Sequence, residues 1–475
     1  MKQVITYAGE NPLVAALYVA SIALTIGVLA TPYYPLAVLP ALAILSFAVL
    51  NRTPQLGYYI IIFLIPFGAY RGLAGEFEYI RLHWIAAFAL LLLIFLHHVA
   101  KKKIPDAARS GMWGLLVLFL AFTLLSALVS RYPAMSFKHV SLLCVAYLFV
   151  FLTMVFVNEK GFRKTLPAVI IWSVSCSSFL SVLGYFFDIP FFAEKVEDGS
   201  FKRGTGTAPD PNNMSLMIVF ALPFLFHWLL HARRPSKRAL AAGLICICLL
   251  GLVTTFSRGG ALVLCIAFVG LIIEYLSRLR PKHLGLIACG VAVLLVIAAV
   301  VVPPSYWERQ KSLVEADDRA IGRRASYIIV AFDMFNERPL LGHGPGTFRE
   351  YYATTSHAER FQGTGESKRR FAHNTYLEVL TGTGILGIAI FGSVILLAWR
   401  SLTKAKHIAL QNNDTELAVL VGSYRLSFAV LLIYLLLFSD VYHKYLLLAL
   451  GFSQVAPRVV NRHKQEVDDA AASLG

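Results

Sequence analysis

The sequence predicts an all-α polytopic membrane protein with about 12–14 transmembrane helices and a large external loop containing an amphipathic helix. Three observations predict this fold class. The 475-residue chain is 57% hydrophobic and only 15% charged, whereas a soluble domain carries about 25% charged residues. Apolar runs near ~20 residues, long enough to cross a bilayer, recur along nearly the whole chain. One long polar stretch, residues 303–373, interrupts them.

The apolar runs place the expected helices in order along the chain. Residues 36–50 and 58–70 are short for a bilayer crossing, which sets the lower limit of the range. We expect spans at residues 13–30, 36–50, 58–70, 82–99, 113–130, 139–157, 166–187, 213–231, 239–256, 260–277, 283–302, 374–399, 416–437 and 442–456.

Short basic loops predict the orientation. Two expected spans separate each basic loop from the next, so all the loops lie on one side, which the positive-inside rule assigns to the cytoplasm. The cations that mark these loops are Lys101, Lys102, Lys103 and Arg109; Lys160, Arg163 and Lys164; Arg233, Arg234, Lys237 and Arg238; Arg278, Arg280 and Lys282; Arg400, Lys404 and Lys406; and Arg458, Arg462 and Lys464.

This orientation predicts a bacterial inner-membrane protein whose active site faces the periplasm. Segments 188–213 and 303–373 then lie outside the cell. We divide the chain into N-terminal transmembrane helices over residues 1–200, a core over 201–456 that includes the external loop, and a cytoplasmic tail over 457–475.

Composition excludes several partners. The net charge of +16 would suggest nucleic acid in a soluble protein, but here much of it lies in short loops between apolar runs, so membrane lipids and no nucleic acid are expected. All six cysteines fall inside apolar runs, which indicates neither a disulfide framework nor a metal site. Asp210 and Asn212 have the spacing of a metal-binding pair, but the flanking prolines favour a turn. We therefore expect no metal and no cofactor.

The long external loop has structure of its own. Its residues 323–337 combine apolar and charged side chains in a pattern typical of an amphipathic helix at the membrane surface, and Pro339 should end it. The helix contains Arg324, a secondary site candidate. Glycine-rich residues 342–346 predict a tight turn after it, and His343 within the turn is another secondary candidate.

Two external arginines require an explanation, because the charge bias of the chain favours the other side. Arg203 opens a Gly-Thr-Gly-Thr stretch, and Arg258 lies in a Ser-Arg-Gly-Gly turn with almost no loop around it. A charge at such a place is costly near hydrocarbon. Snorkelling to lipid headgroups is one interpretation. The other is that each guanidinium clamps a phosphate with two hydrogen bonds, while the adjacent glycines let backbone amides approach the anion.

His373 is the candidate catalytic base. It follows three basic residues and precedes Thr375 and Glu378, whose capping-box spacing predicts the start of a helix. The positive end of that helix should lower the pKa of the imidazole, so that a neutral ring could accept a proton from a hydroxyl. A polar interface residue is the alternative. Asn374, a secondary candidate, is expected to cap the helix rather than to catalyse.

Arg425 is the last secondary candidate. It lies inside an expected span, and an intramembrane arginine is a functional-site hypothesis by default. Asp440, at the outer end of the same span, is about 22 Å away along a helix, so the two cannot pair directly.

Four stretches in this order resemble the O-antigen ligase and polymerase superfamily. They cover roughly residues 200–400, while the first 200 residues agree only in hydrophobicity. The stretches are 203–213 with its Arg-Gly-Thr-Gly-Thr start, the Ser-Arg-Gly-Gly turn at 257–260, the 322–346 segment from Gly-Arg-Arg to Gly-His-Gly-Pro-Gly, and Ala-His-Asn-Thr-Tyr-Leu-Glu at 372–378.

The resemblance implies a glycosyltransferase that uses an undecaprenyl-pyrophosphate-linked glycan as donor. In such enzymes external arginines hold the pyrophosphate and a loop histidine activates the acceptor hydroxyl, which here implies Arg203, Arg258 and His373. The family reaction is metal-independent and inverts the anomeric carbon. The acceptor would be a glycan or lipid A-core.

Several functions remain open at the level of sequence. The superfamily includes ligases, polymerases and protein O-glycosylating transferases, and the long first half favours a surface-polysaccharide polymerase slightly. A flippase of lipid-linked glycans is the alternative from another class. Its charges should line a path through the membrane, whereas most of the candidate arginines lie at one face. A scaffold without catalysis is a third option.

Overall fold

The structure is a computed structural model that describes Ala23 and residues 54–68, 110–195, 202–275, 319–362 and 368–472. The chain divides into two compact units. One comprises residues 1–61 and 84–103, and the other comprises residues 62–83 and 104–475. The expected spans at 13–30, 36–50, 82–99 and 283–302 lie outside the described residues.

The described residues are almost entirely helical, as the sequence predicts. The elements are α4 (Pro54–Phe63), η2 (Pro66–Gly68), α6 (Met112–Leu128), α7 (Pro133–Phe156), η5 (Gly161–Thr165), α8 (Leu166–Phe186), β1 (Ala193–Lys195), β2 (Lys202–Gly204), α9 (Pro211–His231), α10 (Pro235–Thr254), α11 (Arg258–Tyr275), α14 (Arg319–Glu337), α15 (Phe348–Ala353), α16 (Ser356–Gln362), α17 (Thr375–Gln411), α18 (Thr415–Tyr434) and α19 (Lys444–Ala472).

Seven of the described helices are long and apolar enough to cross a membrane. They are α7, α8 together with η5, α9, α10, α11, α17 and α18, and each covers a span expected from the sequence. The expected span at 113–130 corresponds to α6, an apolar helix of 17 residues. The expected last span lies in α19, which is not among the seven. The all-α membrane fold is thereby confirmed.

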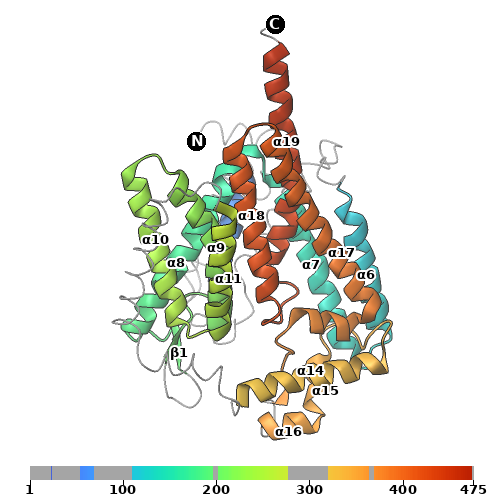
Figure 1. Ribbon diagram of the computed structural model, residues 1–475. Helices are drawn as coiled ribbons and strands as arrows, with labels where there is room; N and C mark the ends of the chain where they lie inside the picture. The colour runs from blue at the N-terminus through green and yellow to red at the C-terminus, as the bar shows by residue number, and fades with distance from the viewer. Residues whose placement is uncertain are drawn as a thin grey trace. The chain divides into compact units, whose positions relative to one another are not determined.

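Helix α18 occupies the centre of the larger unit. It packs against α9 and α11 on one side and against α17 and α19 on the other (Figure 1). Helices α8 and α10 flank α9, while α6 and α7 pack against α17 and α19. The chain therefore builds two groups of helices that meet at α18, and the ends of α18 lie where both groups can contribute side chains.

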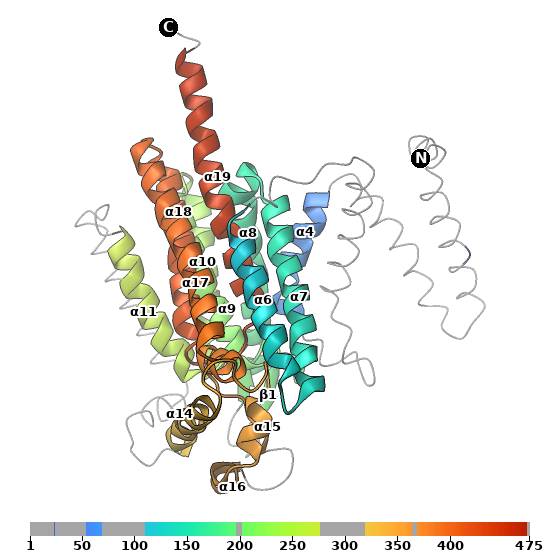
Figure 2. The same cartoon turned by 90° about the vertical axis from the view of Figure 1, so that its right-hand side faces the viewer.

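The described basic loops gather at one end of this bundle. Arg163 from η5 pairs with Asp414 at the start of α18, with 2.9 Å between nitrogen and oxygen, and Arg458 of α19 donates to the carbonyl of Met154 at the end of α7. Helices α14, α15 and α16 lie at the opposite end (Figure 2). This arrangement matches the alternation expected from the charges.

Three details differ from the sequence prediction. Strands β1 and β2 form a small antiparallel hairpin that pairs Glu194 with Arg203, in a segment expected to be loop. Helix α17 continues to Gln411, beyond the expected end at residue 399, because its cationic last turns can extend past the bilayer into water. Helix α19 likewise runs through the boundary expected at 456–457, with Pro457 inside it.

Candidate functional site

Arg203 is held at the end of the bundle opposite to the basic loops. It lies on β2, and its Nε donates to the carbonyl of Thr255 at 2.8 Å. Its Nη2 donates to Oδ1 of Asn212 at 3.3 Å. Burial lowers the pKa of Arg203, while the nearby carboxylates of Glu194 and Asp210 raise it. The guanidinium nevertheless stays charged, because an arginine loses its proton only well above physiological pH.

A polar network joins Arg203 to the start of α11 and the end of α18. Asn212 Oδ1 also accepts from Ser257 Oγ at 3.0 Å, and the hydroxyl of Tyr434 donates to the carbonyl of Asn212 at 2.8 Å. Ser215 Oγ lies 2.5 Å from the same tyrosine oxygen. Tyr434 is almost fully buried, so the network is a fixed part of the bundle rather than a surface contact.

Arg258 is the first residue of α11, directly after the turn expected from the sequence. Ser257 Oγ accepts from the backbone N–H of Gly260 at 3.1 Å and so caps the helix. Asn212 links this turn to Arg203, since its Oδ1 accepts from both Ser257 and Arg203. After burial, which is the largest cause, the positive charge of Arg258 also contributes to the lowered pKa of Arg203 and of Arg324. Together these arginines form what we call the arginine cluster.

Three helices begin beside this cluster. Asp210 Oδ1 caps α9 by accepting from the backbone N–H groups of Asn212 and Asn213, Ser257 caps α11, and the first residue of α17, Thr375, donates its N–H to the carbonyl of Leu435 next to Tyr434. Each helix start carries a partial positive charge of roughly half a unit. The cluster is therefore an environment that attracts anions.

Arg324 reaches the cluster from α14. Helix α14 ends at Glu337 before Pro339, as expected. Its buried face, with Tyr327 and Met334, packs in a small core with α15 and α16. Partial desolvation lowers the pKa of Arg324, as do the charges of Arg258 and Arg323. Helix α14 thus adds a third guanidinium to the two that the resemblance assigned to the donor.

His373 adopts a strained backbone conformation next to the cluster. Its φ of +49° lies in the left-handed region, which costs a residue other than glycine of order 1–3 kcal/mol. Hydrogen bonds on both sides hold the turn: Ala372 N donates to Glu378 Oε1 at 2.8 Å, and Asn374 N donates to Ser439 Oγ at 3.0 Å. Strain maintained in this way is common at functional sites.

The surroundings of His373 keep its imidazole neutral. Burial lowers the pKa of His373 to about 4, and the positive charges of Arg324, Arg323 and Arg370 contribute to that shift. Its ring lies 5.7 Å from the ring of Tyr327, centroid to centroid. At physiological pH the ring is therefore uncharged and has a nitrogen lone pair that can accept a proton.

Asn374 caps α17, as expected, since its Oδ1 accepts from the backbone N–H groups of Tyr376 and Leu377. The expected capping box between Thr375 and Glu378 is wrong. Thr375 donates its hydroxyl to the carbonyl of Phe438 instead, because the helix starts one residue earlier than the box requires. Asn374 thus fixes the helix that follows His373.

His343 is part of the packing beneath the site. The turn at 342–346 forms as expected, with positive φ at Gly342, Gly344 and Gly346. His343 is 1% exposed. Its Nδ1 lies 2.7 Å from the hydroxyl of Tyr351 and its Nε2 lies 2.8 Å from the carbonyl of Met334. With both ring nitrogens occupied, it positions α14 and α15.

Close helix packing explains the glycines beside the arginines. A β-carbon on Gly204 would lie 2.3 Å from Ser181 Oγ, and one on Gly260 would lie 2.7 Å from the β-carbon of Ser215. These positions lack side chains because neighbouring helices approach closely. The expectation that these glycines let backbone amides approach an anion stays a prediction.

Arg425 belongs to a separate ion-pair group. Its Nη2 lies 3.3 Å from Oε2 of Glu274, whose other carboxylate oxygen pairs with Lys406. The guanidinium carbon lies 5.5 Å from the ring centroid of Trp399. Glu274 lies near the end of α11, roughly 24 Å along the helix from Arg258. The structure therefore separates Arg425 from the arginine cluster.

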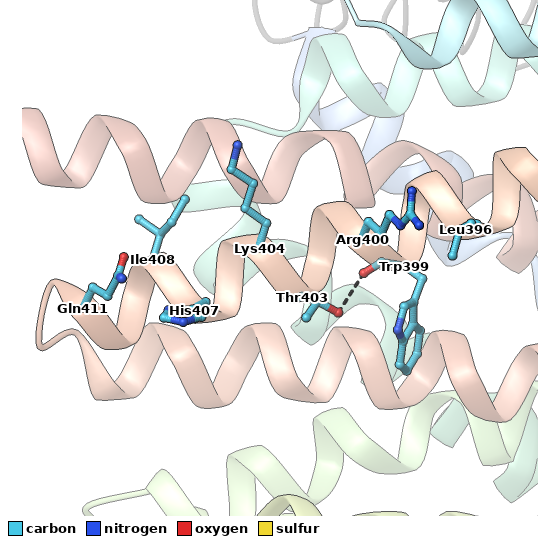
Figure 3. A pocket seen from close by; sticks show the side chains of 8 residues that line it. All are labelled: Leu396, Trp399, Arg400, Thr403, Lys404, His407, Ile408 and Gln411. Atoms are coloured by element: carbon cyan, nitrogen blue, oxygen red, sulfur yellow. Dashed lines mark hydrogen bonds between the residues drawn. The ribbon is translucent and has the colours of Figure 1, made fainter.

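A groove of about 610 Å³ lies along this same part of α17 (Figure 3). All of its lining residues come from one helix, among them Trp399, Arg400, Lys404 and His407. The groove lies among the cations of a basic loop, at the end of the bundle away from His373. It therefore contributes nothing to the site described above.

Asp210 and Asn212 do not form a metal site. The carboxylate of Asp210 caps α9, and the side chain of Asn212 accepts from Arg203 and Ser257. Within the described ranges, no group of three or more His, Cys, Asp or Glu side chains is placed to hold a metal ion.

The sequence analysis missed Tyr434 and Glu274. Tyr434 ends an apolar run, where an aromatic side chain is typical of the membrane interface, so its role in the network had no distinct signal. Glu274, in contrast, stands alone in the apolar run 260–277. An intramembrane acid implies a partner, and that signal could have identified the pair with Arg425.

Residues 243–392 match the family model described as O-antigen ligase. The match covers about a third of the chain and contains Arg258, Arg324 and His373, whereas Arg203 lies before it. A search of curated proteins finds no match to the chain.

Proposed function

Because this chain belongs to the O-antigen ligase and polymerase superfamily, we propose that it transfers a glycan from undecaprenyl pyrophosphate to an acceptor hydroxyl at the periplasmic face of the bacterial inner membrane. The observation that carries the proposal is a chain of contacts that links Arg203 to the helix start at Arg258 and to the turn of His373. Asn212 accepts from both Arg203 and Ser257, Tyr434 donates to Asn212, and the adjacent Leu435 accepts from Thr375. The positive charge of Arg324 acts on His373, whose pKa burial lowers most. The acceptor would be a growing glycan or lipid A-core.

The arginine cluster suits the leaving group of this reaction. A glycosyl pyrophosphate gains negative charge on its phosphate oxygens as the bond to the anomeric carbon breaks. Guanidinium groups and helix starts already fixed in place stabilise such charge without rearranging. A guanidinium also binds phosphate oxygens with two parallel hydrogen bonds. We assign the donor pyrophosphate to Arg203 and Arg258, with Arg324 closing over it.

His373 is suited to take the proton from the acceptor hydroxyl. The acceptor oxygen attacks the anomeric carbon as the carbon–oxygen bond to the pyrophosphate breaks, and the hydroxyl proton passes to the neutral imidazole. A single displacement of this kind inverts the anomeric configuration. Undecaprenyl pyrophosphate leaves. The charges that a metal ion would otherwise neutralise are met by the arginines, so the proposed reaction is metal-independent.

The position of the cluster supports a transferase over a flippase. The grouped arginines lie at one end of the bundle, and Arg425, deeper along α18, is paired with Glu274. A flippase would instead need charges along a path across the membrane. The described basic loops at the opposite end support an outer location for the cluster.

Purified protein tests the proposal directly. We expect it to convert undecaprenyl-pyrophosphate-linked glycan into an extended or acceptor-linked product, with release of undecaprenyl pyrophosphate and no loss of rate in EDTA. Donor movement across vesicles without any change in its covalent structure would favour the flippase. For location, Ser356→Cys should react with a thiol reagent added to the periplasm, and Ser236→Cys should not; the reverse would place the site inside the cell.

A further inference from the structure

A second pocket opens beside the turn that carries His373. Its volume is about 320 Å³, at the small end of the ~300–1,000 Å³ range of small-molecule sites. Residues of α6 and α7 form one wall. The other walls come from the 345–346 turn, the first turns of α17 and residues 439–442. None of the three clustered arginines lines it.

The pocket lining combines two kinds of surface: apolar side chains, and polar groups that can accept hydrogen bonds from hydroxyls. Glu378 and Asp440 contribute carboxyl groups, His139 and Tyr442 contribute polar rings, and Phe371 adds an aromatic ring. Sugar rings carry several hydroxyl groups around an apolar C–H face, so a wall that mixes acceptors, donors and an aromatic ring matches them. The carboxylate of Asp440 would repel a pyrophosphate, which argues against donor binding there.

The polar groups of the pocket are already fixed in place. The hydroxyl of Tyr442 donates to the carbonyl of His139 at 3.1 Å and lies 3.2 Å from its Nδ1. Asp440 Oδ1 accepts from the N–H of Tyr442 at 2.9 Å. A site whose groups are held before the ligand arrives loses less conformational freedom on binding.

One loop joins this pocket to the arginine cluster. Residues 439–442 line the pocket. Tyr434, a few residues earlier, contacts Asn212, which accepts from Arg203 of the arginine cluster. The same loop supports the turn that carries His373, since Ser439 Oγ accepts from the N–H of Asn374. The turn itself contributes to the pocket, because Phe371 and Glu378 line it on either side of His373 in sequence.

We propose that this pocket binds the terminal sugar of the acceptor glycan, on the side of the 371–378 turn away from the pyrophosphate. The inference rests on the proposed function and adds the substrate subsite that function leaves unassigned. It assigns the acceptor to α6, α7 and the 439–442 loop, and the donor to α9, α11 and α14.

Filling the pocket tests this assignment. Leu142, on α7, lines the pocket, whereas Val145, on the same helix, does not. Both side chains are 37% exposed, so Leu142→Trp and Val145→Trp are matched in their helix and exposure. Donor is extracted from a strain that lacks this gene, and transfer is measured against increasing amounts of envelope glycolipid from that strain. Retention of undecaprenyl pyrophosphate by each purified variant is measured separately.

We expect Leu142→Trp to raise the KM for the acceptor fraction by about tenfold or more, with retention of undecaprenyl pyrophosphate unchanged. Val145→Trp should keep a normal KM. Asp440→Asn, which preserves the shape of the pocket and its acceptor oxygen, should raise the same KM by a smaller factor.

A normal acceptor KM in both Leu142→Trp and Asp440→Asn would overturn the subsite. So would a Leu142→Trp variant that no longer retains undecaprenyl pyrophosphate, or one whose kcat falls while its acceptor KM stays normal. In each of these cases the wild-type protein still transfers glycan. Absence of transfer by the wild-type protein would overturn the proposed function itself, and the subsite with it.

Discussion

Half-buried arginines at the two ends of the helix bundle have different partners. Arg425 lies against the carboxylate of Glu274, which also pairs with Lys406. Arg203, at the other end, donates to two neutral oxygens, the carbonyl of Thr255 and the amide of Asn212. Arg425 is therefore paired directly with a carboxylate, whereas Arg203 is oriented by neutral oxygens, with the carboxylates of Glu194 and Asp210 acting on it from nearby. We infer from the comparison that Arg425 holds helices together and that Arg203 is oriented to bind an anion.

The largest effect should follow from removing His373. His373→Ala should lower the transfer rate by ~10²–10⁴, since removal of a general base typically has this effect. Retention of undecaprenyl pyrophosphate should survive, because the arginines hold it. Single-turnover transfer and lipid retention are measured on the same preparation. If donor retention disappears together with transfer, His373 contacts the phosphate or supports the fold instead.

A somewhat smaller effect should follow from replacing the guanidinium group of Arg203 or Arg258 by the amine of a lysine. Arg203→Lys and Arg258→Lys keep the charge but lose two-pronged hydrogen bonding. Each should lower the rate by roughly 10²–10³, by analogy with removal of one oxyanion-hole donor. The kcat/KM for lipid-linked donor measures this loss. Full turnover in a well-folded lysine variant would favour the snorkelling interpretation.

The pH dependence of the reaction should reflect the arginine end of the bundle. His373 must be neutral to accept a proton, and its pKa is lowered from 6.5 to about 4. The kcat/KM should therefore stay nearly constant from pH 7.5 down to about 5 and fall only near the lowered pKa. Bound pyrophosphate offsets the positive charges, so kcat should fall at a higher pH. A kcat/KM that halves near pH 6.5 would show that neither burial nor the nearby arginines lower the pKa of this ring.

The smallest effect on catalysis should come from replacing Arg425, which is paired with Glu274. Arg425→Met removes one partner of Glu274 and leaves Lys406 in place. We expect a measurable drop in the unfolding temperature, because the ion pair is partly buried. Specific transfer activity of the folded protein should change by less than about twofold. Thermal unfolding and activity are compared in the same detergent, and a collapse of activity at full stability would move Arg425 into the site.

Sequence was sufficient for most of the architecture, for physical reasons. Crossing a bilayer requires long apolar helices and biases cations to one side, so most of the spans in the described part of the chain could be predicted, as could the gathering of basic loops at one end. The expected span at 58–70 is an exception, since α4 there has only ten residues and is not a candidate span. The ends of α17 and α19 could not, because a helix continues into water wherever its residues allow. The β1–β2 hairpin was missed because its strands are three residues each.

The site was predicted less completely. Arg203, Arg258 and His373 were identifiable because a charged or ionisable side chain next to a membrane span implies a functional role. Their grouping depends on contacts between segments far apart in sequence, such as that of Tyr434 with Asn212, and no local pattern encodes these. The cause of the His373 pKa shift was also incomplete, since burial and arginines outside the helix account for it.

The most direct test of the central claim compares the same substitution at both ends of the bundle. Binding of undecaprenyl pyrophosphate is measured for the wild-type protein, Arg258→Met and Arg425→Met. Loss of a charge-assisted contact of roughly 1.5–3 kcal/mol predicts about 10- to 150-fold weaker binding for Arg258→Met, and binding within about twofold of wild type for Arg425→Met. Equal losses in the two variants, or a loss confined to Arg425→Met, would contradict the account.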